Sequence, residues 1–118
     1  MKGIKFFLIL ILAFYYSPSY GQVIVDGTDI NRLPEVKYCQ VSISGKMFAK
    51  NIEAHVDYGQ EKLNKKNSRI QSTEGNHRKF KTAIDLINFM AYNKWEFVES
   101  YISIDNNDPY KHYLFKKN

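Results

Sequence analysis

The sequence predicts an α+β domain of two layers, in which one helix covers one face of an antiparallel sheet. Three observations support this prediction: alternating runs over 36–44 and 52–58, an amphipathic stretch over 82–93, and aromatic-rich runs over 95–104 and 110–117. The expected order is therefore strand, strand, helix, strand, strand (β-β-α-β-β). The chain has 118 residues, which suffices for one such domain.

The first 21 residues differ in composition from the rest. Lys2 and Lys5 precede an uninterrupted apolar run over 6–16. A small, polar, helix-breaking stretch follows over 17–21. This is the pattern of a secretory signal peptide with cleavage after Gly21. The alternative is a membrane anchor, but a span needs about 20 apolar residues and this run is shorter. We therefore expect export to the periplasm or the cell exterior, and no transmembrane span after cleavage.

The composition excludes several classes of protein. With 44% hydrophobic and 15% aromatic residues, the chain is too apolar for wholesale disorder. Its single cysteine excludes an internal disulfide framework and a Cys-rich zinc site. Cleavage would leave 97 of the 118 residues and lower the net charge from +5 to +3, because two lysines are lost. One modest core is expected at that size.

Two strands are predicted before the helix. Residues 22–34 hold a short β-branched run, Asp26-Gly27 and Pro34, which indicate a linker or an edge strand ahead of a single domain over 35–118. In the first strand, 36–44, one face carries Cys39, Val41 and Ile43. In the second, Ile52, Ala54, Val56 and Tyr58 alternate with Glu53, His55 and Asp57.

The helix follows a long polar stretch over 61–79, which we expect to be a loop. Thr82 and Asp85 form a capping-box pattern at the helix start. One stripe for packing on the sheet comprises Ala83, Leu86, Ile87 and Met90. Asn93 stands where a left-handed residue would end the helix. The last two strands are joined by a turn over 105–109.

The second half of the chain carries four motifs: FKTAID at 80–85, LINFM at 86–90, WEFV at 95–98 and HYLFKK at 112–117. Together they resemble a widespread group of small uncharacterised bacterial domains, a domain of unknown function. Exported members also carry the kind of sequence seen here as Tyr38-Cys39 and Asp57-Tyr58-Gly59-Gln60. The chain departs from the group at Lys94, where Gly usually precedes the Trp. The resemblance implies the α+β architecture and brings no catalytic residue.

Few residues suggest chemistry. His55 and Asp57 leave the same strand face, but two ligands do not make a metal site, so a solvated polar face is favoured. Cys39 is a candidate nucleophile if His55 lowers its pKa, or a bridge to a second chain, but a small buried side chain is favoured. A metal-dependent or thiol enzyme built on these three residues is the alternative function. We expect His112 to be stacked or hydrogen-bonded, and His77 to be exposed.

Four residues of the third strand bear on other activities. We expect Trp95 and Phe97 to lie in the core, rather than to form an exposed platform for sugars or bases. Glu96 and Glu99 suggest a paired-carboxylate hydrolase, but their odd spacing places them on opposite faces of a regular strand. That spacing weakens the hydrolase interpretation.

The segment 61–81 carries seven basic residues against two acidic ones. The basic residues are Lys62, Lys65, Lys66, Arg69, Arg78, Lys79 and Lys81. Such a cluster is a weak candidate binding site for an anionic envelope lipid or polysaccharide through salt-sensitive contacts. Export disfavours nucleic acid, and a solvated polar loop is the favoured alternative.

None of these candidate catalytic or metal-binding sets contains three side chains that are expected to converge on one point. The sequence therefore favours a small non-catalytic binding or interaction module of the bacterial envelope over an enzyme, with no cofactor and no metal. Its partner would be an unknown protein or an anionic envelope component. A further alternative is an inhibitor or immunity-type protein that blocks a secreted partner with its sheet or with the basic segment.

Overall fold

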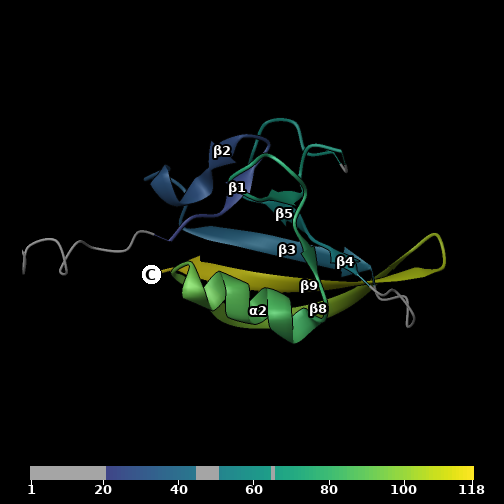
Figure 1. Cartoon of the computed structure of the whole chain (residues 1–118). Helices are drawn as coiled ribbons and strands as arrows, with labels where there is room; N and C mark the ends of the chain where they lie inside the picture. Colours follow the sequence, from purple (N-terminus) through teal and green to yellow (C-terminus); the bar gives the residue numbers. More distant parts are fainter. Residues whose placement is uncertain (1–20, 45–50, 65) are drawn as a thin grey trace, which may run out of the picture.

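A computed structural model describes residues 21–44, 51–64 and 66–118, so the signal-peptide prediction falls almost wholly outside the described residues. The described strands form three antiparallel sheets of four, three and two strands, with one α-helix among them (Figure 1). This confirms the α+β class. The expected strand order is not confirmed, because short strands precede and interrupt it.

The four-stranded sheet holds the longest strands. Its order is β5 (His55–Asp57), β3 (Tyr38–Ser44), β9 (Asp108–Lys117) and β8 (Trp95–Asp105). The predicted alternation in the first strand is confirmed, since the buried residues of β3 are Cys39, Val41 and Ile43. The sheet therefore has one face in the core and one face outside it.

A two-residue turn joins β8 to β9, as the sequence predicts. Asp105 pairs with Asp108, and between them Asn106 and Asn107 have φ of 49° and 67°. Two left-handed residues in succession are typical of a turn whose twist matches that of the flanking strands, and Asn tolerates this conformation. The turn thus sets the register of the hairpin from Asp105 back to Glu99.

Residues 22–34 contribute two strands and a short helix. β1 (Ile24–Val25) lies between β2 (Thr28–Asp29) and β6 (Ile70–Gln71) in the three-stranded sheet, and the 3-10 helix η1 (Ile30–Arg32) follows β2. Three residues of this segment are buried: Val23, Val25 and Ile30. The expected linker or edge strand thus supplies a central strand and part of the core.

The structure differs from two predictions, the continuous strand over 52–58 and the loop over 61–79. The expected strand over 52–58 is divided at Ala54, because β4 (Ile52–Glu53) pairs with β7 (Lys79–Phe80) while β5 pairs with β3. The expected loop contains β6 and the first residue of β7. Isolated apolar residues explain the difference, since Ile70 and Phe80 are both fully buried and fix an otherwise polar stretch to the core.

The helix α2 (Ala83–Tyr92) begins as predicted. The Thr82 hydroxyl accepts a hydrogen bond from the Asp85 amide at 3.1 Å, and the Asp85 carboxylate accepts one from the Lys81 amide at 3.0 Å. These bonds satisfy amides that have no partner inside the helix. The stripe is confirmed: Leu86 and Met90 are buried, and Ala83 and Ile87 pack against the core.

The end of the helix differs from the prediction. Asn93 has φ −93° and is not left-handed, whereas Lys94 has φ 72°. The Asn93 side chain is instead used for bonding, since its Nδ2 donates to the Phe89 carbonyl at 2.8 Å and its Oδ1 accepts from the Gln22 amide at 2.9 Å. The left-handed position falls one residue later than predicted, on Lys94.

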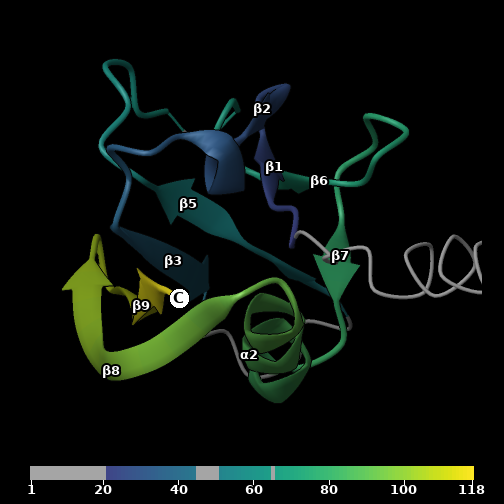
Figure 2. The ribbon, with the colours of Figure 1, turned by 90° about the vertical axis from the view of Figure 1, so that its left-hand side faces the viewer.

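Residues of the four-stranded sheet, β1, β7 and α2 form one hydrophobic core among the described residues. Figure 2 shows how these elements are arranged around one another. Trp95 is fully buried, as predicted, and its Nε1 donates to Asn31 Oδ1 at 2.8 Å. Phe97 is not in the core, because it lies on the outermost strand and is 42% exposed.

No helix in the described part of the chain is both long and apolar enough to span a membrane.

Candidate functional site

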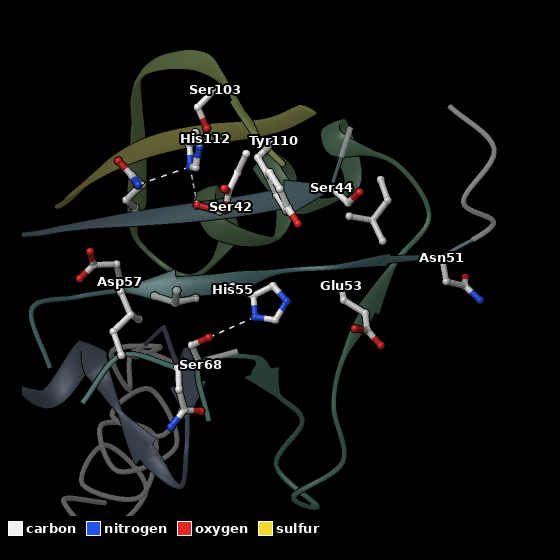
Figure 3. A pocket seen from close by; sticks show the side chains of 16 residues that line it. Ser42, Ser44, Asn51, Glu53, His55, Asp57, Ser68, Ser103, Tyr110 and His112 are labelled. Atoms are coloured by element: carbon white, nitrogen blue, oxygen red, sulfur yellow. Dashed lines mark hydrogen bonds between the residues drawn. The ribbon is translucent and has the colours of Figure 1, made fainter. Parts of the chain in front are cut away.

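A cavity of about 560 Å³ lies on the face of the four-stranded sheet opposite the core (Figure 3). Its floor comes from alternate residues of β3, β5 and β9, and its walls come from residues 51–53, 63–64 and 68 and from the end of β8. Hydroxyl and amide groups dominate the lining: Gln40, Ser42, Ser44, Asn51, Asn64, Ser68, Ser103 and Tyr110. The cavity thus presents hydroxyl and amide groups within a lining whose exposed surface is mostly apolar.

The strand register brings two imidazoles to this face. Ser42 on β3 pairs with His55 on β5 and with His112 on β9, so these three residues form a row across the sheet. Tyr101 on β8 pairs with His112 and extends the row. Directly paired residues share a face, so all four side chains lie on the side of the cavity.

His112 is fixed on every side, which confirms the prediction that it is stacked and hydrogen-bonded. Its Nδ1 lies 2.6 Å from the Ser42 hydroxyl, its Nε2 lies 2.6 Å from the Ser103 hydroxyl, and its ring stacks on Tyr101 with centroids 4.6 Å apart. A neutral imidazole donates from one nitrogen and accepts at the other. One serine therefore accepts a hydrogen bond from the ring while the other donates one, and each can turn its remaining capacity toward a ligand.

Two neighbours complete this network. Gln40 Oε1 accepts a hydrogen bond from the Tyr101 hydroxyl at 2.8 Å, and its Nε2 lies 3.5 Å from His112 Nδ1. On the opposite wall, His55 Nδ1 lies 3.1 Å from the hydroxyl of the buried Ser68 (Figure 3). The polar groups thus hold one another in place before any ligand enters, which reduces the entropy that binding would cost.

The carboxylates of Glu53 and Asp105 lie in the walls and that of Asp57 lies on the floor; two of the three have partners. Glu53 pairs with Arg69 at 3.4 Å, and Asp57 accepts the Gly59 amide at 3.0 Å. Asp105 is exposed at the end of β8. Among the described residues that line the cavity, none is Lys or Arg. The described part of the lining therefore carries no permanent positive charge.

The three residues of the alternative enzyme site, His55, Asp57 and Cys39, do not lie on one face of the sheet. His55 and Asp57 share a face, as predicted, through their pairing with Ser42 and Gln40. Cys39 is 2% exposed and belongs to the opposite face, so its predicted burial is confirmed. Burial raises the pKa of its thiol from 9.0 to about 12, although the charge of Lys117 acts in the other direction. Within the described residues, no three of the His, Cys, Asp and Glu side chains form a group that could hold a metal ion.

The basic segment is mostly exposed, and its described members have different neighbours. Arg69 lies near His77, with its Nη1 3.2 Å from the ring, in addition to its pairing with Glu53. Arg78 lies over the Phe89 ring at 4.4 Å. The exposed lysines are Lys62, Lys66, Lys79 and Lys81, and Lys65 lies outside the described residues. His77 is exposed, as predicted.

The prediction that Glu96 and Glu99 lie on opposite faces of their strand is wrong. The register shifts between Phe97 and Glu99, so that Glu96 pairs with Lys116 and Glu99 with Leu114. Lys116 and Leu114 are two residues apart on β9 and share a face, so the glutamates share it as well. The prediction of opposite faces assumed a regular strand, and the extra residue, Val98, breaks that regularity.

The Ser42–His112–Ser103 network was not predicted from the sequence. A signal existed, since Gln40, Ser42 and Ser44 alternate with the buried residues of β3, just as His112 alternates with Tyr113 on β9. The missing information was that β3 and β9 are neighbours, although about 70 residues separate them.

No protein-family model, curated protein or solved structure matches the chain, so the architecture and the cavity are the basis for a functional proposal.

Proposed function

We propose that the protein is a small exported, non-catalytic binding module of the bacterial envelope, and that it binds a neutral polyhydroxylated ligand of the carbohydrate class in the cavity over the four-stranded sheet. The observation that carries the proposal is the lining of that cavity, where serine, tyrosine, amide and imidazole groups converge on one space. Export is inferred from the pattern of residues 1–21.

The chemistry of the lining favours a neutral ligand. Sugar hydroxyls both donate and accept hydrogen bonds, and the Ser42, Ser103 and Gln40 side chains can do the same. The carboxylates of Glu53 and Asp57 already have partners, and with no Lys or Arg among the described lining residues an anion would find no cationic side chain to pair with there. The volume of about 560 Å³ lies within the usual range for small-molecule sites.

The placement of His112 supports binding rather than catalysis. Both of its ring nitrogens lie 2.6 Å from serine hydroxyls, and no carboxylate takes the second nitrogen as it would in an acid–base–nucleophile triad. Cys39, the other candidate nucleophile, lies on the opposite face. A fluorophosphonate reagent, which reacts with activated serines, should leave Ser42 and Ser103 unmodified; labelling of either would contradict the non-catalytic part of the proposal.

Binding can be tested by calorimetric titration of the purified protein with neutral mono- and disaccharides, with uronic acids and sugar phosphates as anionic controls. We expect saturable binding of a neutral sugar, and a loss of about fivefold in affinity for Ser103→Ala, since one hydrogen bond is worth about 1 kcal/mol. Ser100→Ala is the matched control, because Ser100 is exposed on the same strand but pairs with Tyr113 on the other face. Tighter binding of the anionic sugars, or equal effects of both substitutions, would refute the proposed site.

A further inference from the structure

The two edge strands of the four-stranded sheet, β5 and β8, differ in how far neighbouring segments cover them. At one edge, β5 has three residues, and the segment after it covers its outer side through backbone hydrogen bonds from Val56 N to Ser68 O at 2.7 Å and from Ile70 N to Ala54 O at 3.3 Å. At the other edge, β8 has eleven residues and pairs with β9, and no described strand pairs with its outer side. Figure 1 shows the β8–β9 hairpin extending past the N-terminal end of α2. With respect to the described residues, β8 is thus a long edge strand whose outer side has no strand partner.

The side chains of this edge are apolar and exposed. Tyr101 is 49%, Ile102 64% and Ile104 75% exposed, and Val98 and Phe97 add to the same strand. Edge strands of monomeric proteins usually carry Lys or Pro, which oppose pairing with another chain. Between residues 95 and 105 there is neither, and the charged residues are all acidic. The bulge of β8, another feature that opposes pairing, lies at Val98, so the regular stretch over 99–105 has no bulge, no Lys and no Pro.

We propose that β8 pairs antiparallel with β8 of a second copy of the protein, so that two four-stranded sheets join into one of eight strands. Antiparallel pairing of two identical strands creates a two-fold axis, and each copy brings the same apolar residues to the joint. The axis is perpendicular to the sheet, so opposed residues share a face. The Ile102 and Ile104 side chains would then lose much of their exposure in both copies at once.

The charges discriminate between two registers of this joint, with the axis at Ile102 or at Tyr101. With the axis at Ile102, Glu99 would face the partner's Asp105, and two carboxylates would oppose each other twice in the dimer. With the axis at Tyr101, Glu99 faces the partner's Ser103, and Ser100 faces the partner's Ile102. Like charges opposite each other destabilise strand pairs. The register centred on Tyr101 is therefore the one we infer, and in it both cavities open on the same side of the joined sheet.

Sedimentation velocity of the purified protein over a range of concentrations tests the dimer. We expect a concentration-dependent dimer, and for Ile102→Lys a dissociation constant raised by at least about 100-fold, because symmetry repeats the lost apolar contact and the added charge. Ile84→Lys is the matched control, since Ile84 is an exposed isoleucine (63%) on α2, away from β8. It should leave the dimer intact, and circular dichroism should show both variants folded.

A cysteine at the axis tests the register. Tyr101→Cys should form a disulfide-linked dimer on mild oxidation, because residues at the axis face each other with Cβ atoms about 5 Å apart. Cys39 does not compete, since it is buried. Ile84→Cys should remain unlinked. A wild-type protein that stays monomeric at all concentrations, a dimer insensitive to Ile102→Lys, or equal cross-linking at both positions would each overturn the proposal.

Discussion

Phe115 and Leu114 are neighbours in β9, yet they face opposite sides of the four-stranded sheet and meet different surroundings. Phe115 is fully buried in the core, while Leu114 lies on the polar face beside Gln40. The same contrast holds along β3, where Val41 is buried and Ser42 contacts His112. Each strand thus supplies stability through one set of residues and the candidate site through the residues between them. Substitutions at adjacent positions should separate the two roles.

The largest expected effect comes from the core face. Phe115→Ala should lower the free energy of unfolding by about 3–5 kcal/mol, because it removes a fully buried ring and leaves a cavity. Leu114→Ala, one residue away, should cost about 1 kcal/mol, since that side chain is only partly buried. Urea unfolding followed by Trp95 fluorescence measures both. Similar losses for the two substitutions would contradict the division between the faces.

A second expected effect concerns the thiol on the core face. Because the pKa of Cys39 is about 12 in the folded protein, the native state keeps a proton that the unfolded chain has lost above about pH 9. Stability from this group is therefore complete below pH 9 and falls as the pH rises toward 12. Cys39→Ala should flatten this alkaline decline relative to wild type, whatever its effect at pH 7.

Thiol chemistry gives an independent check of the same burial. A maleimide reagent should modify native Cys39 far more slowly than the urea-unfolded chain, because the thiol is 2% exposed and remains protonated at neutral pH. Equal rates in the two states would show that this face opens in the native protein, and would weaken the contrast between the faces.

The smallest expected effect lies at a position that belongs to neither face. Lys94 has φ 72°, a conformation that costs a non-glycine residue about 1 kcal/mol. Lys94→Gly should therefore raise the free energy of unfolding by up to about 1 kcal/mol without changing ligand binding. Lys94→Ala, which removes the amine but keeps the Cβ atom, should give no such gain in thermal unfolding measurements.

Local patterns predicted the elements whose determinants lie close together in the sequence. The cap at Thr82, the stripe of α2, the alternation in β3 and the Asn106-Asn107 turn each depend on a few consecutive residues. The short strands β6 and β7 were missed because single buried residues, Ile70 and Phe80, hold them in place by contacts distant in sequence. Of the candidate site, the polar face was visible as alternation, but the convergence on His112 depends on the pairing of β3 with β9.

The extra residue in β8 gives position 98 an unusual constraint. Trp95 and Ser103 are eight residues apart, and in a regular strand they would share a face, yet Trp95 lies in the core and Ser103 lines the cavity. The register shift at Val98 makes this possible. Replacement of Val98 by another residue leaves the number of residues between Trp95 and Ser103 unchanged. Its deletion would force either the tryptophan out of the core or the serine out of the cavity. Among homologous chains, this position should therefore vary in residue type but not in length.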